Sequence, residues 1–210
     1  MKTLQFNLDK YQAQKLLRPF RKKTAVILFW MEAIKIMSSY AAPSSKDKVG
    51  DMLVRFGKMR RVTIHSDDKS FSASFPFLVS NADDQLVFST KSGIEINSRV
   101  SSEVISILSL SKAFESNNLI ELLDSLEQTS EDPDTLWEVL GELIQEDDGY
   151  VRLDHDPERE NGDIHPLNHL DIFYSQSATF KLGLKSKYGI DDFFDILDIN
   201  SNCSFLEKTS

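Results

Sequence analysis

Polar and apolar residues alternate in the middle of the chain, which is typical of β-structure. In residues 60–78, Val62 and Ile64 alternate with polar neighbours, a second alternating run follows, and Asp67-Asp68 separates the two. Successive side chains of a strand point to opposite faces, so this pattern predicts two antiparallel strands joined by a short turn. The sequence therefore predicts a β-hairpin here.

Two shorter runs, residues 85–90 and 93–97, have the same character. Because Lys91-Ser92-Gly93 lies between them and glycine suits a tight turn, we expect a second hairpin that turns at these residues. Residues 47–59 fit either a helix or a strand, and the pattern does not decide between them.

Apolar residues at helical spacing predict helices in most of the remaining chain. Pro19 should bend or end the first helix, Thr24 can cap the second, and Asp132-Pro133 is a typical helix start. The helices expected from this spacing cover residues 8–22, 24–40, 101–114, 119–126 and 132–143.

Together these elements predict an α+β fold, a mainly antiparallel sheet flanked by helices. A length of 210 residues fits one domain that covers residues 1–210. We expect three parts in it. They are a basic helical N-terminal part (1–61), the sheet with acidic helices (62–148), and a returning hairpin with a final helix (149–200).

Composition narrows the class of protein. With 40% hydrophobic and 27% charged residues the chain has an ordinary globular balance, which excludes collagen-like, disordered and coiled-coil classes. The single cysteine, Cys203, excludes a disulfide framework. No apolar run approaches the roughly 18 residues of a membrane helix, and the first residues do not resemble a signal peptide. We therefore expect a cytoplasmic protein without a membrane partner.

The charge is divided unevenly along the chain. Residues 1–61 carry 14 basic and 4 acidic residues, a net charge of +10, whereas the remainder carries 10 basic and 29 acidic residues, a net charge of −19. Such a division indicates either a surface that faces a charged partner or two parts that neutralise each other inside the fold. A total of −9 argues against nonspecific DNA coating. The candidate binding residues are Arg18, Arg21, Lys22, Lys23, Arg60 and Arg61.

The segment richest in candidate chemistry lies between Gly149 and Tyr174, where two alternating runs flank a polar loop. This arrangement predicts two antiparallel strands with a long connection. If the apolar side chains of both strands face the core, the opposite face collects one guanidinium, one imidazole and two carboxylates. These four candidate catalytic residues are Arg152, Asp154, His169 and Asp171.

Two interpretations of this group stay open. His169 could move a proton while Asp171 or Asp154 orients it and Arg152 holds a phosphate, or the four residues could form a salt-bridge ladder on an exposed sheet face. His165 and His169 are four residues apart, as in helical zinc sites, but about 13 Å of strand would separate them. A shared metal would require that His165 folds back from the loop or that Pro166 starts a helix turn. We predict no metal and no cofactor. Phosphate-loop, nucleophile-elbow and zincin motifs are missing from the sequence.

The same segment resembles an uncharacterised bacterial family, domain of unknown function twenty-two-ninety. The resemblance rests on the run Arg152 to Pro157, on His165-Pro166-Leu167-Asn168-His169-Leu170, and on Gly189 to Leu197, which resembles the family's final helix. It covers the last third of the chain and departs at Leu170-Asp171-Ile172, where a further histidine and glycine are expected. The resemblance implies an intracellular bacterial protein from a phage-defence or mobile-element locus, and it implies no activity.

Three functional hypotheses follow from these observations. The first is an accessory or adaptor subunit of a bacterial multi-protein system, which binds a protein partner or, as a second candidate, nucleic acid. The second is a small phosphodiesterase-type enzyme, a ribonuclease or toxin, that uses the His169 group; a short likeness to small bacterial toxins supports it. The third is an antitoxin-like binder whose acidic stretch, Glu103 to Asp148, masks a basic partner.

Overall fold

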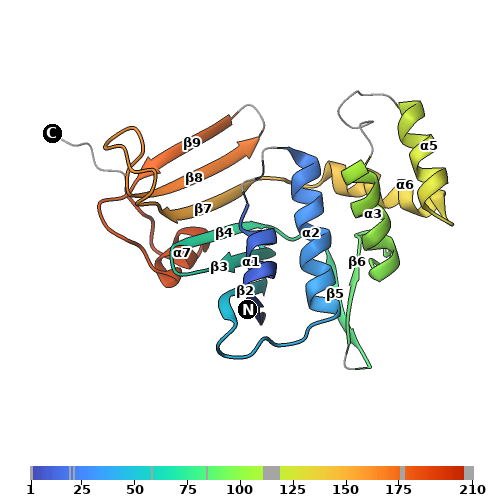
Figure 1. Ribbon diagram of the computed structural model, residues 1–210, viewed down its shortest axis with the longest axis horizontal. Helices are drawn as coiled ribbons and strands as arrows, with labels where there is room; N and C mark the ends of the chain where they lie inside the picture. Colours follow the sequence, from blue (N-terminus) through green and yellow to red (C-terminus); the bar gives the residue numbers. More distant parts are fainter. Residues whose placement is uncertain are drawn as a thin grey trace.

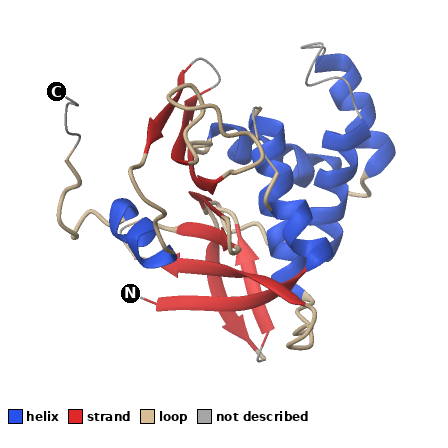
Figure 2. Ribbon diagram, turned by 60° about the vertical axis from the view of Figure 1, so that its left-hand side comes forward, coloured by secondary structure: helices blue, strands red, loops and turns tan. Residues whose placement is uncertain are grey.

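The computed structural model describes residues 2–18, 20, 22–57, 59–83, 85–110, 119–175 and 178–205. It has the predicted α+β class, with a large antiparallel sheet, a small two-stranded sheet and flanking helices (Figures 1 and 2). None of the described helices has the length and apolar character needed to cross a membrane.

The large sheet has the strand order β1-β2-β3-β4-β7-β8-β9, and each strand is antiparallel to its neighbours. The predicted hairpin at residues 60–78 is confirmed as β3 and β4, and the two strands predicted around the histidine-rich loop are β7 and β8. The strands of this sheet are β1 (Lys2–Asp9), β2 (Lys48–Phe56), β3 (Arg61–His65), β4 (Lys69–Ser74), β7 (Tyr150–His155), β8 (Asn168–Ser175) and β9 (Ala178–Gly183).

Helices cover both faces of the sheet. The helices are α1 (Lys10–Leu16), α2 (Lys23–Ser38), α3 (Ser98–Leu110), α5 (Leu119–Thr129), α6 (Pro133–Gln145) and α7 (Ile190–Leu197). All of the predicted helices have counterparts here, and Asp132 caps α6 as its sequence suggests. The last predicted residues of α3 and residues 111–118 after it lie outside the described residues.

Two apolar clusters hold these layers together. The larger one joins α1, α2, α3, α5 and α6 to one face of the sheet and includes Trp30 and Phe71. The smaller one lies on the other face, where Phe193 of α7 packs against Leu153 and Leu170. Burial of apolar side chains on both sides stabilises the β7–β8 pair from above and below.

The N-terminal part is not purely helical, which corrects the prediction for residues 1–61. Residues 2–9 form an edge strand, and the first helix begins at Lys10 because Asp9 and Gln12 make a capping box. This helix ends at Leu16, before Pro19. The ambiguous segment 47–59 is the strand β2.

The caps and the second hairpin also differ from expectation. Thr24 does not cap α2, because the helix begins one residue earlier, at Lys23. The N-cap residue is Lys22, whose side chain makes no capping hydrogen bond. The second hairpin pairs β5 (Leu78–Ala82) with β6 (Gln85–Ser89). Its turn contains Asp83 at φ 51°, a left-handed conformation that aspartate tolerates. The predicted turn at Lys91-Ser92-Gly93 does form, but residues 93–97 are not a regular strand. They return along β6 with one isolated bridge, Ser89 to Glu95, and with backbone hydrogen bonds from Thr90 to the Ile94 carbonyl and from Ile96 to the Phe88 carbonyl.

Candidate functional site

The register of β7 and β8 brings the four candidate catalytic residues together. Arg152 pairs with Asp171, and Asp154 pairs with His169. Residues directly opposite in an antiparallel pair point to the same face, so the two strands place all four side chains side by side. The prediction that they share one face is confirmed by this geometry.

The Arg152 guanidinium joins the two carboxylates. Its Nε donates to Asp154 Oδ2 at 2.7 Å, and its terminal nitrogen Nη2 lies 2.5 Å from Asp171 Oδ2. Lys181 of β9 adds a second cation, with its Nζ 3.5 Å from Asp171 Oδ1. The two carboxylates therefore face two cationic side chains, and the four formal charges cancel.

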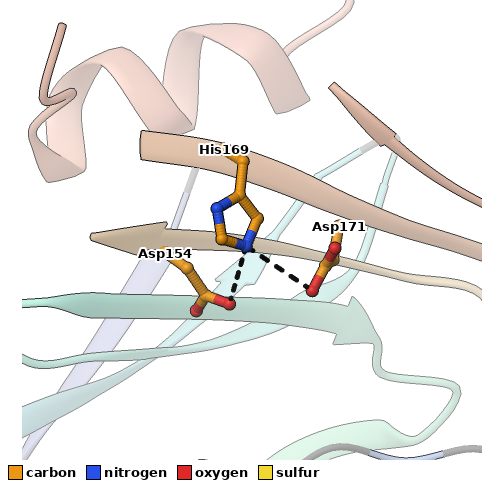
Figure 3. Close-up of side chains that lie close together, drawn as sticks. All are labelled: Asp154, His169 and Asp171. Atoms are coloured by element: carbon orange, nitrogen blue, oxygen red, sulfur yellow. Dashed lines mark ion pairs between the residues drawn. The ribbon is translucent and has the colours of Figure 1, made fainter. Parts of the chain in front are cut away.

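The hydrogen bonds of His169 fix the orientation of its ring. Nδ1 lies 2.7 Å from the Pro166 carbonyl oxygen, which can only accept, so Nδ1 carries the proton and donates it. Figure 3 shows that Nε2 points between Asp154 and Asp171. Its separations from their Oδ2 atoms, 3.5 and 3.9 Å, exceed hydrogen-bond length.

The predicted salt-bridge ladder is present, but the expectation that it lies on an exposed face is wrong, because this group is mostly buried. The side chains of His169 and Asp154 are 0% and 2% exposed, and those of Arg152 and Asp171 are 16% and 19% exposed. We expected that only the sheet face without the charged group meets the core, and this expectation is wrong as well. Tyr150 and Phe173 stack at 5.0 Å on the same face as the charged group and belong to the larger cluster.

His165 lies closer than strand geometry predicts. An isolated bridge between Asn161 and His165 folds the connecting loop back, and the His165 ring lies 4.6 Å from that of His169. Among the described residues, three buried side-chain atoms have no hydrogen-bond partner: Asp154 Oδ1, His165 Nδ1 and His169 Nε2. The site is thus compact and closed.

One metal-ligand combination exists among the described residues. Asp154, His169 and Asp171 each offer one ligand atom, and these atoms lie within 4.8 Å of one another. The surroundings oppose a divalent cation, however, because Arg152 and Lys181 already balance both carboxylates. An added cation would leave an excess of buried positive charge, which is costly.

The structure does not bring the candidate binding residues that it describes into one cavity or charged cluster. Arg18 and Lys22 are exposed, and Arg21 lies outside the described residues. Lys23 donates to the Glu146 carbonyl and lies 3.7 Å from Asp148, so the basic and acidic parts do neutralise each other at this point. Arg60 is exposed, and its guanidinium donates to the Phe77 carbonyl. Arg61 lines a cavity that Arg60 does not reach.

Sequence reasoning missed a partner of Arg61. Arg55 of β2 lies directly opposite Arg61 of β3, and both line a cavity with Thr63, Ser72 and residues in and after α7. The available signal was the position of Arg55 between the apolar residues Val54 and Phe56, but it does not distinguish a strand from a helix over so short a run.

A second missed feature lies on α6. Its inner residues Leu136, Val139, Leu140 and Leu143 are buried, whereas Trp137 and Ile144 are 42% and 41% exposed. These two, with Gly141 between them, follow the i, i+4, i+7 spacing of one helix face. A Cβ placed on Gly141 would meet no atom within 4 Å, so the helix backbone is open there.

No family model, curated protein or solved structure matches the chain. The resemblance to domain of unknown function twenty-two-ninety therefore stays a prediction, and the function has to be argued from the geometry.

Proposed function

We propose that the protein is an accessory or adaptor subunit that docks a basic protein partner on the outward face of α6. The observation that carries this proposal is Trp137, a large aromatic side chain left exposed on a helix whose other face is fully packed. Tryptophan is enriched at the energetic centres of protein interfaces, because it buries much area at low entropic cost.

Charge indicates the chemistry of the partner. Residues 119–148 contain eleven acidic residues and no basic one. Those on the inner side of α6 are satisfied within the fold: Glu142 accepts from Thr90 and from the backbone of Lys91, and Glu146 pairs with Lys91. Within the described ranges no cation pairs with the exposed Asp134 or Glu138, next to Trp137.

An acidic face with an aromatic centre favours a basic protein over nucleic acid. Carboxylates repel phosphates, whereas complementary potentials speed association and reject partners of the wrong sign. The same face suits the antitoxin-like binder, which is a special case of this proposal in which the partner is a toxin.

The phosphodiesterase hypothesis has weaker support. A general base has to reach the proton that it removes, within hydrogen-bond distance or through one water. The His169 side chain is fully buried, and its Nε2 faces two carboxylates that Arg152 already occupies. We therefore assign this group a structural role, the fixing of the loop from residue 156 to 167 onto β7 and β8.

Capture from the native host tests the docking proposal. Tagged wild-type protein is compared with Trp137→Ala and with Phe180→Ala, a control that truncates an aromatic side chain 51% exposed on β9. We expect a stoichiometric basic protein with the wild type and the control, and its loss with Trp137→Ala. With the purified partner, the Trp137→Ala substitution should weaken the Kd about 30-fold, as loss of a central tryptophan costs about 2 kcal/mol.

Two results would contradict the docking proposal. One is the absence of any stoichiometric partner. The other is a partner that binds Trp137→Ala as well as it binds the wild type. Hydrolysis of RNA that disappears in His169→Ala, with the fold intact, would instead support the phosphodiesterase.

A further inference from the structure

Arg55 and Arg61 form an unusual pair on the sheet face that α7 covers. They are directly opposite across β2 and β3. Like charges at such positions destabilise a sheet, because their side chains lie only about 5 Å apart at the Cβ atoms. A pair of this kind is expected where something else on the same face, or a ligand, supplies negative charge.

The protein supplies little of that charge. In the part of the chain that the structure describes, no carboxylate forms an ion pair with either guanidinium. Asp198 lines the same cavity, but its Oδ1 accepts from the backbone and side-chain amides of Asn200. These hydrogen bonds, with a smaller contribution from Arg55, lower the pKa of Asp198, so it is ionised. The charged side chains that line the cavity, two arginines and one aspartate, carry a surplus of one positive charge. Asp147, which is outside this lining, favours the charged form of Arg61 without forming an ion pair with it.

The hydrogen bonds of Arg61 hold its head in place. Nε donates to Ser72 Oγ at 2.9 Å, and the terminal nitrogen Nη2 donates to the Ser72 carbonyl at 2.8 Å. Ser72 Oγ also accepts from Thr63 Oγ1 at 3.0 Å. Burial lowers the pKa of Arg61, which reflects the cost of keeping this charge away from water. The side chain is thus oriented before any ligand arrives.

Arg55 is oriented from the other side. Its guanidinium carbon lies 4.1 Å from the centre of the Phe194 ring, a cation–π contact with α7. A guanidinium stacked on a ring keeps its N–H groups free in the plane, where they can donate to an oxyanion. The two arginines therefore approach the cavity from β2 and β3, while α7 and the following residues close it.

The cavity between them has a volume of about 60 Å³. One water needs roughly 10–15 Å³ of such space, so there is room for several waters or for one tetrahedral oxyanion group. A whole nucleotide does not fit inside. A ligand would present only a small charged group to the two arginines.

From these observations we infer that Arg55 and Arg61 form a binding site for a phosphate group. Arginine is well suited to phosphate, since its guanidinium stays charged and carries five N–H donors. Arg61 uses Nε and one N–H of Nη2 for Ser72, which leaves its other terminal N–H groups for a ligand. The surplus of one positive charge matches a singly charged phosphate. The group can belong to free inorganic phosphate or to the phosphodiester of a nucleic acid, and both have the same recognition chemistry.

Isothermal titration calorimetry of the full chain tests the site, with inorganic phosphate and a short oligouridylate as separate probes. Arg55→Gln and Arg61→Gln should each weaken binding at least about tenfold, since each removes a charge-assisted hydrogen-bond donor. Arg99→Gln is the matched control, because the side chain of Arg99 is 47% exposed on α3 and pairs with Glu103, away from this cavity. Thermal melting of each variant checks that it is folded, and Arg55→Gln serves if Arg61→Gln does not fold.

The two probes separate the sources of the phosphate. Saturable binding of inorganic phosphate as tight as that of the oligouridylate supports a free anion, and much tighter oligouridylate binding supports a nucleic acid. Two results would overturn the site: no saturable binding of either probe, or equal binding by wild type, Arg55→Gln and Arg99→Gln. Neither result bears on the docking of a protein to α6.

Discussion

Two groups of charged side chains lie on opposite faces of the large sheet, and they differ in how their charge is balanced. On one face Arg152 bridges Asp154 and Asp171, and Lys181 approaches Asp171. On the other face Arg55 and Arg61 lie opposite each other with a single carboxylate, Asp198, in the same cavity. The first group is neutral and closed, whereas the second is positive and lines a cavity of about 60 Å³.

This difference separates a structural role from a binding role. Buried charges that cancel inside the fold specify how strands and loops meet, and they require no ligand. Charges that remain unbalanced beside a cavity raise the free energy of the folded protein, and a ligand of opposite charge lowers it again. The same residue types therefore predict different roles, and the local sum of charges decides between them.

The largest expected effect is on the closed group. Asp154→Ala removes the carboxylate that is 2% exposed and leaves Arg152 with less compensation. Breaking a buried pair in this way costs about 3–5 kcal/mol, so the free energy of unfolding should fall by that amount. Urea denaturation measures it. The control is Asp163→Ala, which removes an exposed carboxylate from the loop between β7 and β8 and should cost less than about 0.5 kcal/mol. A cost below 1 kcal/mol for Asp154→Ala would show that the group is not a structural lock.

The register of this group could be predicted from the sequence, but its burial could not. Alternation on β7 and β8 is enough to place Arg152 near Asp171, because period two determines the face. Burial depends on contacts between distant segments: Phe193 of α7 covers one face, and Pro166 reaches His169 only because the loop folds back. No local pattern encodes these contacts.

The N-terminal strand and the arginine pair were missed for different reasons. Leu4, Phe6 and Leu8 alternate with polar residues, so β1 was visible in the sequence but was overlooked beside the stronger helical pattern that follows. Arg55 belongs to a segment whose period was ambiguous. Without a strand assignment for β2, its position opposite Arg61 could not be foreseen.

A smaller effect, in the opposite direction, is expected at the positive group of Arg55 and Arg61. Arg55→Met keeps an apolar stem for Phe194 but removes one of two like charges. Relief of the repulsion and loss of the cation–π contact are each worth about 1 kcal/mol or less, so without phosphate the stability should stay the same or rise slightly. Urea denaturation in a phosphate-free buffer measures the change. A loss above 2 kcal/mol would mean that Arg55, like Asp154, is a structural charge.

A still smaller effect concerns His65, on the same face as Arg61. Burial lowers the pKa of His65 from its ordinary value of 6.5, with Lys48 acting in the same direction and Asp51 and Asp67 opposing them. The neutral ring is thus favoured in the fold. Its contribution to stability is present above pH 6.5 and is lost as the pH falls through the lower pKa of the folded state. In His65→Gln, the decline of the unfolding free energy below about pH 6.5 should be shallower than in the wild type. Parallel curves would contradict this assignment.

The smallest expected effect is that of added metal, and it tests the charge argument most directly. Asp154, His169 and Asp171 are close enough to share an ion, and the unprotonated Nε2 of His169 points at both carboxylates. If geometry alone decided, zinc or manganese should raise the Tm in a saturable way, since a ligand that binds only the folded state stabilises it. Because Arg152 and Lys181 already balance the carboxylates, we expect no change in Tm on adding either metal or a chelator.

Arg152→Met removes one of these cations. If metal raises the Tm of Arg152→Met but not that of the wild type, the guanidinium is what excludes the ion, whereas a rise in the wild type would overturn the charge argument.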